Sequence, residues 1–180
     1  MRTSSWLVGL MSSRALQADV DVFIQGGDES RVRLTIDLSD LKRSQTGSII
    51  GRIWFAAGNA GFPAPRWSDF VVVLLGWWIR ELLRLRGGWT QAELLFMDGP
   101  YSVGLDASQD RWAFSFLRDE AADESMPRTV SAHGGDFETN IVAVVREVIA
   151  ACRRHGWSDD PEVQQLVRLS DELGRASRLR

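Results

Sequence analysis

One stretch of this chain decides its fold: Trp67-Ser-Asp-Phe-Val-Val-Val-Leu-Leu-Gly-Trp-Trp-Ile-Arg-Glu-Leu-Leu-Arg-Leu-Arg86. The stretch predicts a helix that is apolar around most of its circumference and ends in a cluster of arginines. Ser68 is placed to cap this helix, and Gly87 and Gly88 are placed to end it. A helix of this kind must be enclosed by the rest of the chain, by a partner protein or by lipid.

The apolar part of the helix is too short to cross a bilayer. No charge falls between Phe70 and Ile79, but Arg80 and Glu81 end the run after about half of the roughly 20 residues that a span needs. Near the N-terminus, the apolar run at residues 6–11 is shorter than the core of a signal peptide, which is usually about 7–15 residues. We therefore expect no membrane span, no targeting segment and a cytoplasmic location.

Composition bounds the class of protein. The chain has 180 residues and is 44% hydrophobic, which suits one domain with a sizeable core. Its formal net charge of −3 opposes nucleic-acid binding by bulk electrostatics. Cys152 is the only cysteine, so the chain forms no internal disulfide, and we expect neither a metal site nor a cofactor. We predict a single domain over residues 1–180 and leave open whether residues 1–18 are loosely attached.

Alternation of apolar and polar residues predicts strands on both sides of the central helix. In residues 31–38 the alternation is cleanest, because Val32, Leu34, Ile36 and Leu38 fall on one face. Further strands are predicted at residues 19–24, 49–55, 93–97, 101–105, 111–117 and 128–133. Glycine and proline content predicts a loop at residues 56–65, and residues 119–127 read as an acidic loop.

Two more helices are predicted towards the C-terminus. One begins at Gly134 and runs to about Arg154, with Ile141, Val145, Val148 and Cys152 on one stripe. The other begins at Pro161, with Asp160 as its cap. The fold class is therefore α+β: a mostly antiparallel sheet of about five to seven strands, with a long central helix and two C-terminal helices packed on it.

A helical wheel divides the central helix into a core face and an unexplained flank. The core face consists of Val71, Leu74, Leu75, Trp78, Leu82 and Leu85, widened by Val72, Ile79 and Leu83. The flank consists of Phe70, Val73, Trp77, Arg80 and Arg84. Either a C-terminal helix or the N-terminal segment covers this flank, or it binds a partner. Tryptophan and arginine dominate the hot spots of protein interfaces.

Candidates for chemistry lie in two turns. The run from His133 to Asp136 joins a strand end to a helix start, a place that can hold an anion or present an imidazole. Asp98 and Tyr101 lie in another turn and would converge on His133 if the two strand ends were neighbours. In the competing interpretation both are ordinary turns, with Asp136 as a helix cap.

A resemblance to known proteins rests on two runs, Leu95-Phe-Met-Asp-Gly-Pro-Tyr101 and Val144-Val-Arg-Glu-Val-Ile-Ala-Ala-Cys-Arg-Arg-His-Gly-Trp157. Together with the tryptophan-rich helix before them, these runs resemble small bacterial α+β proteins that are similar to the immunity partners of polymorphic toxins. The resemblance covers roughly residues 20–175. It implies a non-catalytic protein that works by binding another protein, and it supplies no catalytic residues.

We therefore predict a non-catalytic protein-binding module, an immunity or accessory protein that occludes or scaffolds its partner. The expected contacts are Phe70, Trp77, Arg80 and Arg84, with a contribution from the loop at residues 119–124. The expected partner is another protein or a second copy of the chain, with neither nucleic acid nor membrane involved. The alternative is a small enzyme or ligand-binding domain whose pocket is lined by Asp98, Tyr101, His133 and Asp136.

Overall fold

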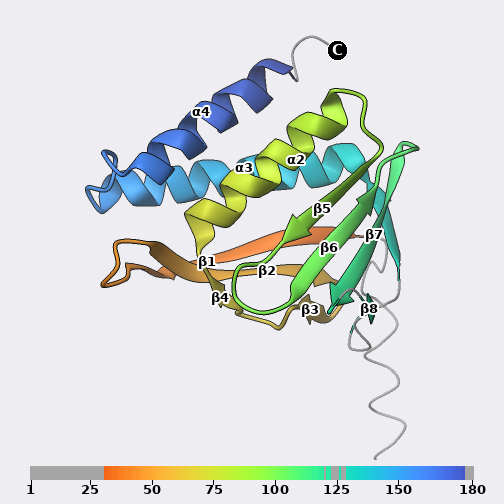
Figure 1. Cartoon of the computed structure of the whole chain (residues 1–180), viewed down its shortest axis with the longest axis horizontal. Helices are drawn as coiled ribbons and strands as arrows, with labels where there is room; N and C mark the ends of the chain where they lie inside the picture. The colour runs from red at the N-terminus through yellow and green to blue at the C-terminus, as the bar shows by residue number, and fades with distance from the viewer. Residues whose placement is uncertain (1–30, 120, 123–125, 127–128, 177–180) are drawn as a thin grey trace, which may run out of the picture.

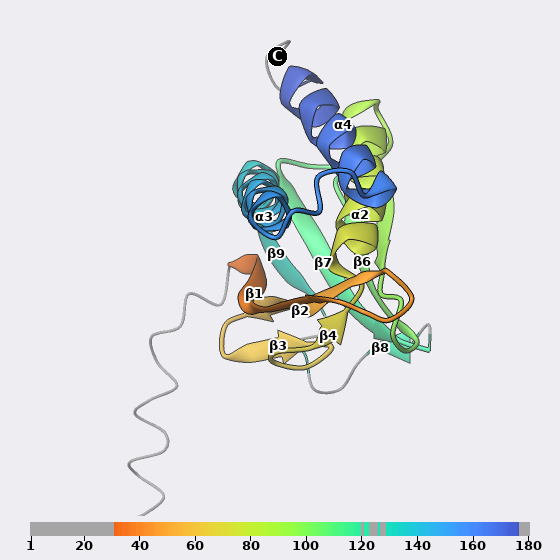
Figure 2. The same ribbon diagram turned by 90° about the vertical axis from the view of Figure 1, so that its left-hand side faces the viewer.

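Nine strands and three helices make up the part of the chain that the structure describes (Figures 1 and 2). The structure is a computed structural model, and the described residues are 31–119, 121–122, 126 and 129–176. The strand predicted at residues 19–24 and the segment 1–18 lie outside this range. Within it, the strands form two antiparallel sheets, one of four strands and one of five.

The first sheet precedes the central helix in the sequence. Its strands are β1 (Val32–Arg43), β2 (Ile49–Ala57), β3 (Ala60–Phe62) and β4 (Ser68–Asp69). Strand β2 pairs with all three others, in the order β1-β2-β3 with β4 also against β2. The strand predicted at residues 31–38 is confirmed and continues to Arg43. The predicted loop at residues 56–65 instead contains β3, whose Phe62 pairs with Phe55.

The second sheet follows the central helix. Its strands are β5 (Gln91–Leu95), β6 (Tyr101–Asp106), β7 (Arg111–Arg118), β8 (Ala121–Ala122) and β9 (Val130–His133). The order is β5-β6-β7-β8, and β9 also pairs with β7. Strand β5 therefore lies at one edge of this sheet. Residues 91–118 form a meander because each pair of neighbouring strands is joined by a short turn.

The central helix α2 (Val71–Arg86) begins later than predicted. Ser68 does not cap it: Ser68 lies in β4 and pairs with Arg52, and the N-cap is Phe70, with no side-chain cap bond. The reason is tertiary, since two residues before the helix are taken up by sheet pairing. The core face predicted by the wheel is buried, except that Leu83 is only partly buried.

Helix α3 has the predicted bounds, Gly134–Arg154, and α4 begins at Pro161 as predicted and continues to Ala176. Asp160 caps α4, since its Oδ1 accepts hydrogen bonds from the backbone N–H groups of Glu162 at 2.9 Å and Val163 at 3.3 Å. Asp136 does not cap α3; His133 is the N-cap and Asp136 lies in the first turn.

The strands thus confirm the α+β class, and they divide into two sheets where one was expected. Helix α2 separates the two sets of strands along the chain, and apolar rings from both sheets meet around it. The ring of Phe55 in β2 lies 5.3 Å from that of Trp78 and 6.5 Å from that of Phe116 in β7. Helix α4 packs on α2 and α3. None of the helices in the described residues is long and apolar enough to span a membrane.

Candidate functional site

The large apolar side chains that the described residues leave exposed gather in one region. Trp77 is 37% exposed, Trp89 60%, Leu95 48% and Met97 42%. They come from α2, from the turn after it, from the end of β5 and from the turn after β5. Single exposed apolar residues are ordinary, but a cluster of large ones is typical of a binding surface.

Two adjoining depressions hold these four side chains. One has a volume of about 740 Å³ and is lined by Trp77, Glu93, Leu95, Phe96, Met97, Gly99, Pro100, Tyr101, Ser102 and Asp119. The other has a volume of about 560 Å³ and is lined by Glu81, Arg84, Trp89, Thr90, Gln91, Ala92, Glu93 and Leu95. Because Glu93 and Leu95 line both, we treat them as one feature and call it the β5 groove.

One wall of the β5 groove includes Trp77 and Arg84, two residues of the α2 flank that the sequence left unexplained. Helix α4 packs on another side of α2, where Leu169 lies 3.9 Å from the position that a Cβ on Gly76 would take. The described residues thus leave Trp77, Arg80 and Arg84 exposed, whereas Phe70 and Val73 are partly buried.

The position of Arg84 in this wall is set by two neighbours. Its Nη1 donates to both carboxylate oxygens of Glu81, at 2.9 and 3.0 Å. Its guanidinium also lies over the ring of Trp89, 4.3 Å from the ring centroid. Contacts of this kind orient a long side chain, so part of the entropy cost of fixing it on binding is already met.

The far end of the β5 groove is held by a residue that sequence reasoning missed, Asp69. Its side chain is buried, and its Oδ2 accepts hydrogen bonds from the backbone N–H groups of Met97 and Asp98, both at 3.1 Å. Its Oδ1 accepts one from Phe70 N–H at 2.7 Å. An aspartate before a helix suggests only a local cap; the two donors 28 and 29 residues further on were not predictable from spacing.

The turn between β5 and β6 requires its glycine. Gly99 has a φ of +86°, and a Cβ there would lie 2.7 Å from the ring of Tyr101. Tyr101 in turn packs edge-on against Trp67, with ring centroids 5.2 Å apart. The rings of Tyr101 and Trp67 therefore pack closely against the turn that carries Met97.

The four residues of the alternative pocket, Asp98, Tyr101, His133 and Asp136, do not lie together in the structure. Tyr101 pairs with Arg118 at one end of β7, while His133 pairs with Arg111 at the other end. Those two arginines stand seven residues apart along β7 (118 − 111), which corresponds to about 23 Å. Asp98 lies near Tyr101, and Asp136 lies one turn into α3 beside His133. The structure thus brings these four residues together in two pairs at opposite ends of the sheet.

The acidic loop contributes one described residue to the β5 groove. Asp119 lines the depression beside Trp77, and its backbone N–H donates to the carbonyl of Pro100 at 2.9 Å. Residues 120 and 123–125 lie outside the described range. Within that range no group of three or more histidine, cysteine, aspartate or glutamate side chains is placed to hold a metal ion.

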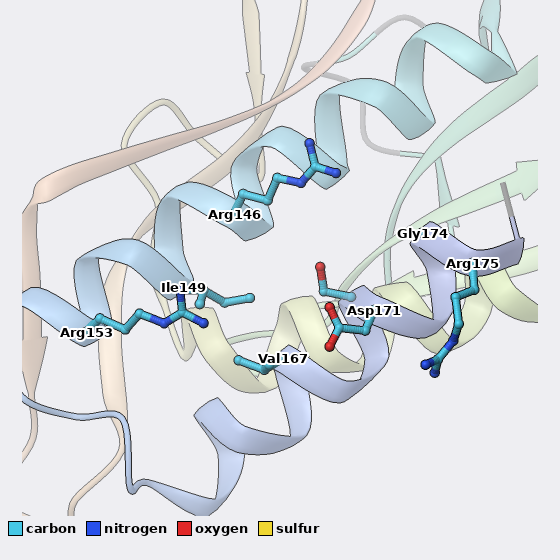
Figure 3. Close-up of a pocket in the computed structure, with 8 residues that line it drawn as sticks. Arg146, Ile149, Arg153, Val167, Asp171, Gly174 and Arg175 are labelled. Carbon is cyan, nitrogen blue, oxygen red and sulfur yellow. The ribbon is translucent and has the colours of Figure 1, made fainter. Parts of the chain in front are cut away.

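A separate depression of about 440 Å³ lies between α3 and α4 (Figure 3). Its lining includes Arg146 and Arg153 on α3 and Asp171 and Arg175 on α4. Figure 3 shows Arg175 extending away from α3, so the cations do not converge on one point. None of the described residues that line this cleft is an exposed large apolar residue.

Comparison with protein-family models, with curated proteins and with solved structures found no match for this chain. The resemblance to immunity proteins therefore stays a prediction. The described residues that line the β5 groove supply apolar side chains, the oriented guanidinium of Arg84 and carboxylates, and they include no histidine or cysteine.

Proposed function

We propose that this protein is a non-catalytic protein-binding module that engages its partner through the β5 groove. In line with its resemblance, it would act as an immunity or accessory protein by occluding or scaffolding that partner. The observation that carries the proposal is the gathering of Trp77, Trp89, Leu95 and Met97 along one groove.

The composition of the groove supports this function. Aromatic residues, methionine and arginine are enriched in protein interfaces, and hot spots cluster where large side chains can be fully desolvated. Trp77 and Trp89 offer that area, and Arg84 lies already oriented between Glu81 and Trp89. A specific interface of ordinary size needs about 800 Å² from each partner, so we expect the contact to extend from the groove onto the adjoining flank of α2.

The test is binding of a natural partner by variants of the groove. The chain is used as bait in cells that express it natively, the captured protein is purified, and its affinity is measured by calorimetry. We expect Trp77→Ala and Leu95→Ala each to weaken binding at least 10-fold, since each truncates a large side chain in the centre of the groove. Arg84→Glu is expected to weaken binding similarly, because it breaks the contacts with Glu81 and Trp89.

The matched controls are Arg146→Glu and Arg153→Glu on α3. Both arginines are exposed helical residues in the cleft between α3 and α4. The two variants are expected to bind the partner with the affinity of the unaltered protein. Equal affinity for the groove variants and the unaltered chain would remove this surface as the binding site.

A further inference from the structure

The two sheets differ in how an edge strand of each is covered by the rest of the described chain. Strand β1, at an edge of the first sheet, is closed by α3: the Oδ1 of Asn140 accepts from Leu34 N–H at 2.6 Å, and its Nδ2 donates to the Leu34 carbonyl at 3.2 Å. Strand β5, at an edge of the second sheet, has no such partner along most of its length among the described residues. An unpaired edge is a template for another strand, and folded proteins usually cover it.

Register shows which groups of β5 face outwards. Phe96 N–H donates to the Tyr101 carbonyl, and Ala107 N–H donates to the Thr90 carbonyl. Hydrogen-bonded pairs alternate in an antiparallel ladder, so Ala92 and Leu94 also bond to β6. The N–H and C=O groups of the odd-numbered residues Gln91, Glu93 and Leu95 therefore point away from the sheet.

Only one of these outward groups has a partner among the described residues. The carbonyl of Leu95 accepts a hydrogen bond from the indole Nε1–H of Trp78 at 2.8 Å. Both groups of Gln91, both groups of Glu93 and the N–H of Leu95 have none. They open into the β5 groove, whose other wall is formed by Trp77, Glu81 and Arg84 of α2.

The unbalanced charge in the groove is negative. Glu81 is paired with Arg84, but Glu93 and Asp119 have no ion pair among the described residues. Glu93 lies at the middle of the outward-facing positions. A basic side chain directly opposite Glu93 on an added strand would be favourable, and a second carboxylate there would be unfavourable.

We propose that the β5 groove binds an extended peptide segment of a partner protein, which adds a strand to β5. The segment alternates apolar side chains, directed toward Trp77 and Arg84, with polar ones, and carries a lysine or arginine opposite Glu93. Main-chain hydrogen bonds to Gln91, Glu93 and Leu95 supply affinity, and the side-chain contacts supply specificity. This inference rests on the proposed function and names the partner's form and charge.

The charge at Glu93 argues against a second copy as the occupant. Symmetric antiparallel pairing of two β5 strands centred on Glu93 would place two carboxylates directly opposite each other. We expect the chain to have the mass of a monomer in light scattering at micromolar concentration. A dimer that dissociates on Leu95→Lys substitution would overturn the inference in favour of self-association.

The probe is a displayed library of random eight-residue peptides, selected on the full chain. We expect the selected peptides to share an alternating apolar pattern with one lysine or arginine, and to bind Glu93→Lys about 10-fold more weakly. The matched control is Glu147→Lys, an exposed glutamate on α3, which is expected to bind them unchanged. Selection of acidic peptides, or of no peptide above background, overturns the inference.

Hydrogen exchange separates strand addition from other modes of binding. In the free chain the amides of Gln91, Glu93 and Leu95 are expected to exchange fast, and those of Ala92 and Leu94 slowly. A bound peptide should slow Glu93 and Leu95 by at least 10-fold. If peptides lose affinity for Trp77→Ala while these amides stay fast, strand addition fails and binding at the groove stands. If peptides bind Trp77→Ala and Leu95→Ala unchanged, the proposed function at this surface fails as well.

Discussion

At the scale of single residues, the two adjacent tryptophans of α2 have opposite environments. Trp78 is fully buried and donates its indole N–H to the Leu95 carbonyl, whereas Trp77 is 37% exposed in the β5 groove. The reason is the 100° rotation between consecutive helical residues, which turns one ring into the core and the next toward the flank. The wheel placed them correctly, but it did not show what lies against each.

Cys152 lends itself to a prediction about pH. Burial raises the pKa of its thiol from 9.0 to about 11, so at pH 8 only about one thiol in a thousand is ionised. We expect a maleimide to label the folded chain at pH 8 at least 100-fold more slowly than the chain in 6 M guanidinium chloride. Labelling at equal rates would contradict a buried thiol.

The raised pKa of Cys152 also makes the free energy of unfolding depend on pH. The folded state holds the thiol proton of Cys152 more tightly than the unfolded state does. The stabilisation of the fold that results is therefore fully present below pH 9 and is lost as the pH rises toward 11. Against Cys152→Val, which lacks the titrating group, the unaltered chain should lose unfolding free energy faster over that interval. Chemical denaturation at pH 8, 9.5 and 10.5 measures the difference.

At the scale of elements, Asp69 joins the start of α2 to the turn after β5. Asp69→Ala leaves the N–H groups of Phe70, Met97 and Asp98 without their acceptor. We expect a loss of about 3 kcal/mol in the free energy of unfolding, because hydrogen bonds to charged groups contribute roughly 1.5–3 kcal/mol each and are not additive. Denaturation in urea measures the change.

Asp98→Ala is the matched control for Asp69→Ala. Asp98 is an exposed aspartate in the same turn, and we expect its loss to change stability by no more than about 0.5 kcal/mol. Equal effects of the two substitutions would show that the turn does not depend on the buried carboxylate.

At the scale of the whole molecule, one ion pair connects all three helices. Arg86 at the end of α2 donates from Nε and Nη2 to the carboxylate of Glu138 in α3, at 3.1 and 2.8 Å, and from Nη1 to the Leu173 carbonyl in α4 at 2.6 Å. Both side chains are largely buried, with 13% and 19% of their surfaces exposed. This ion pair is therefore more deeply buried than the pair between Arg84 and Glu81 on the same helix.

Glu138→Ala is expected to lower the free energy of unfolding by about 2–3 kcal/mol, because it leaves a poorly solvated guanidinium without its carboxylate. Glu81→Ala removes the exposed partner of Arg84 and should cost less than about 1 kcal/mol. Thermal and urea unfolding of the two variants compare the pairs directly. Similar losses would mean that the helix junction does not depend on Arg86.

The sequence by itself determined the elements: the bounds of α3, the start of α4, the core face of α2, most strands and the α+β class. These follow from local periodicity and from caps such as Asp160, which depend on neighbours along the chain. Only the tertiary structure decided that there are two sheets, that Ser68 and Asp69 join the first of them, and that His133 lies far from Asp98. It also placed β5 at an edge beside Trp77. Periodicity shows which face of an element is apolar, but what lies against that face depends on pairings between segments distant in the chain.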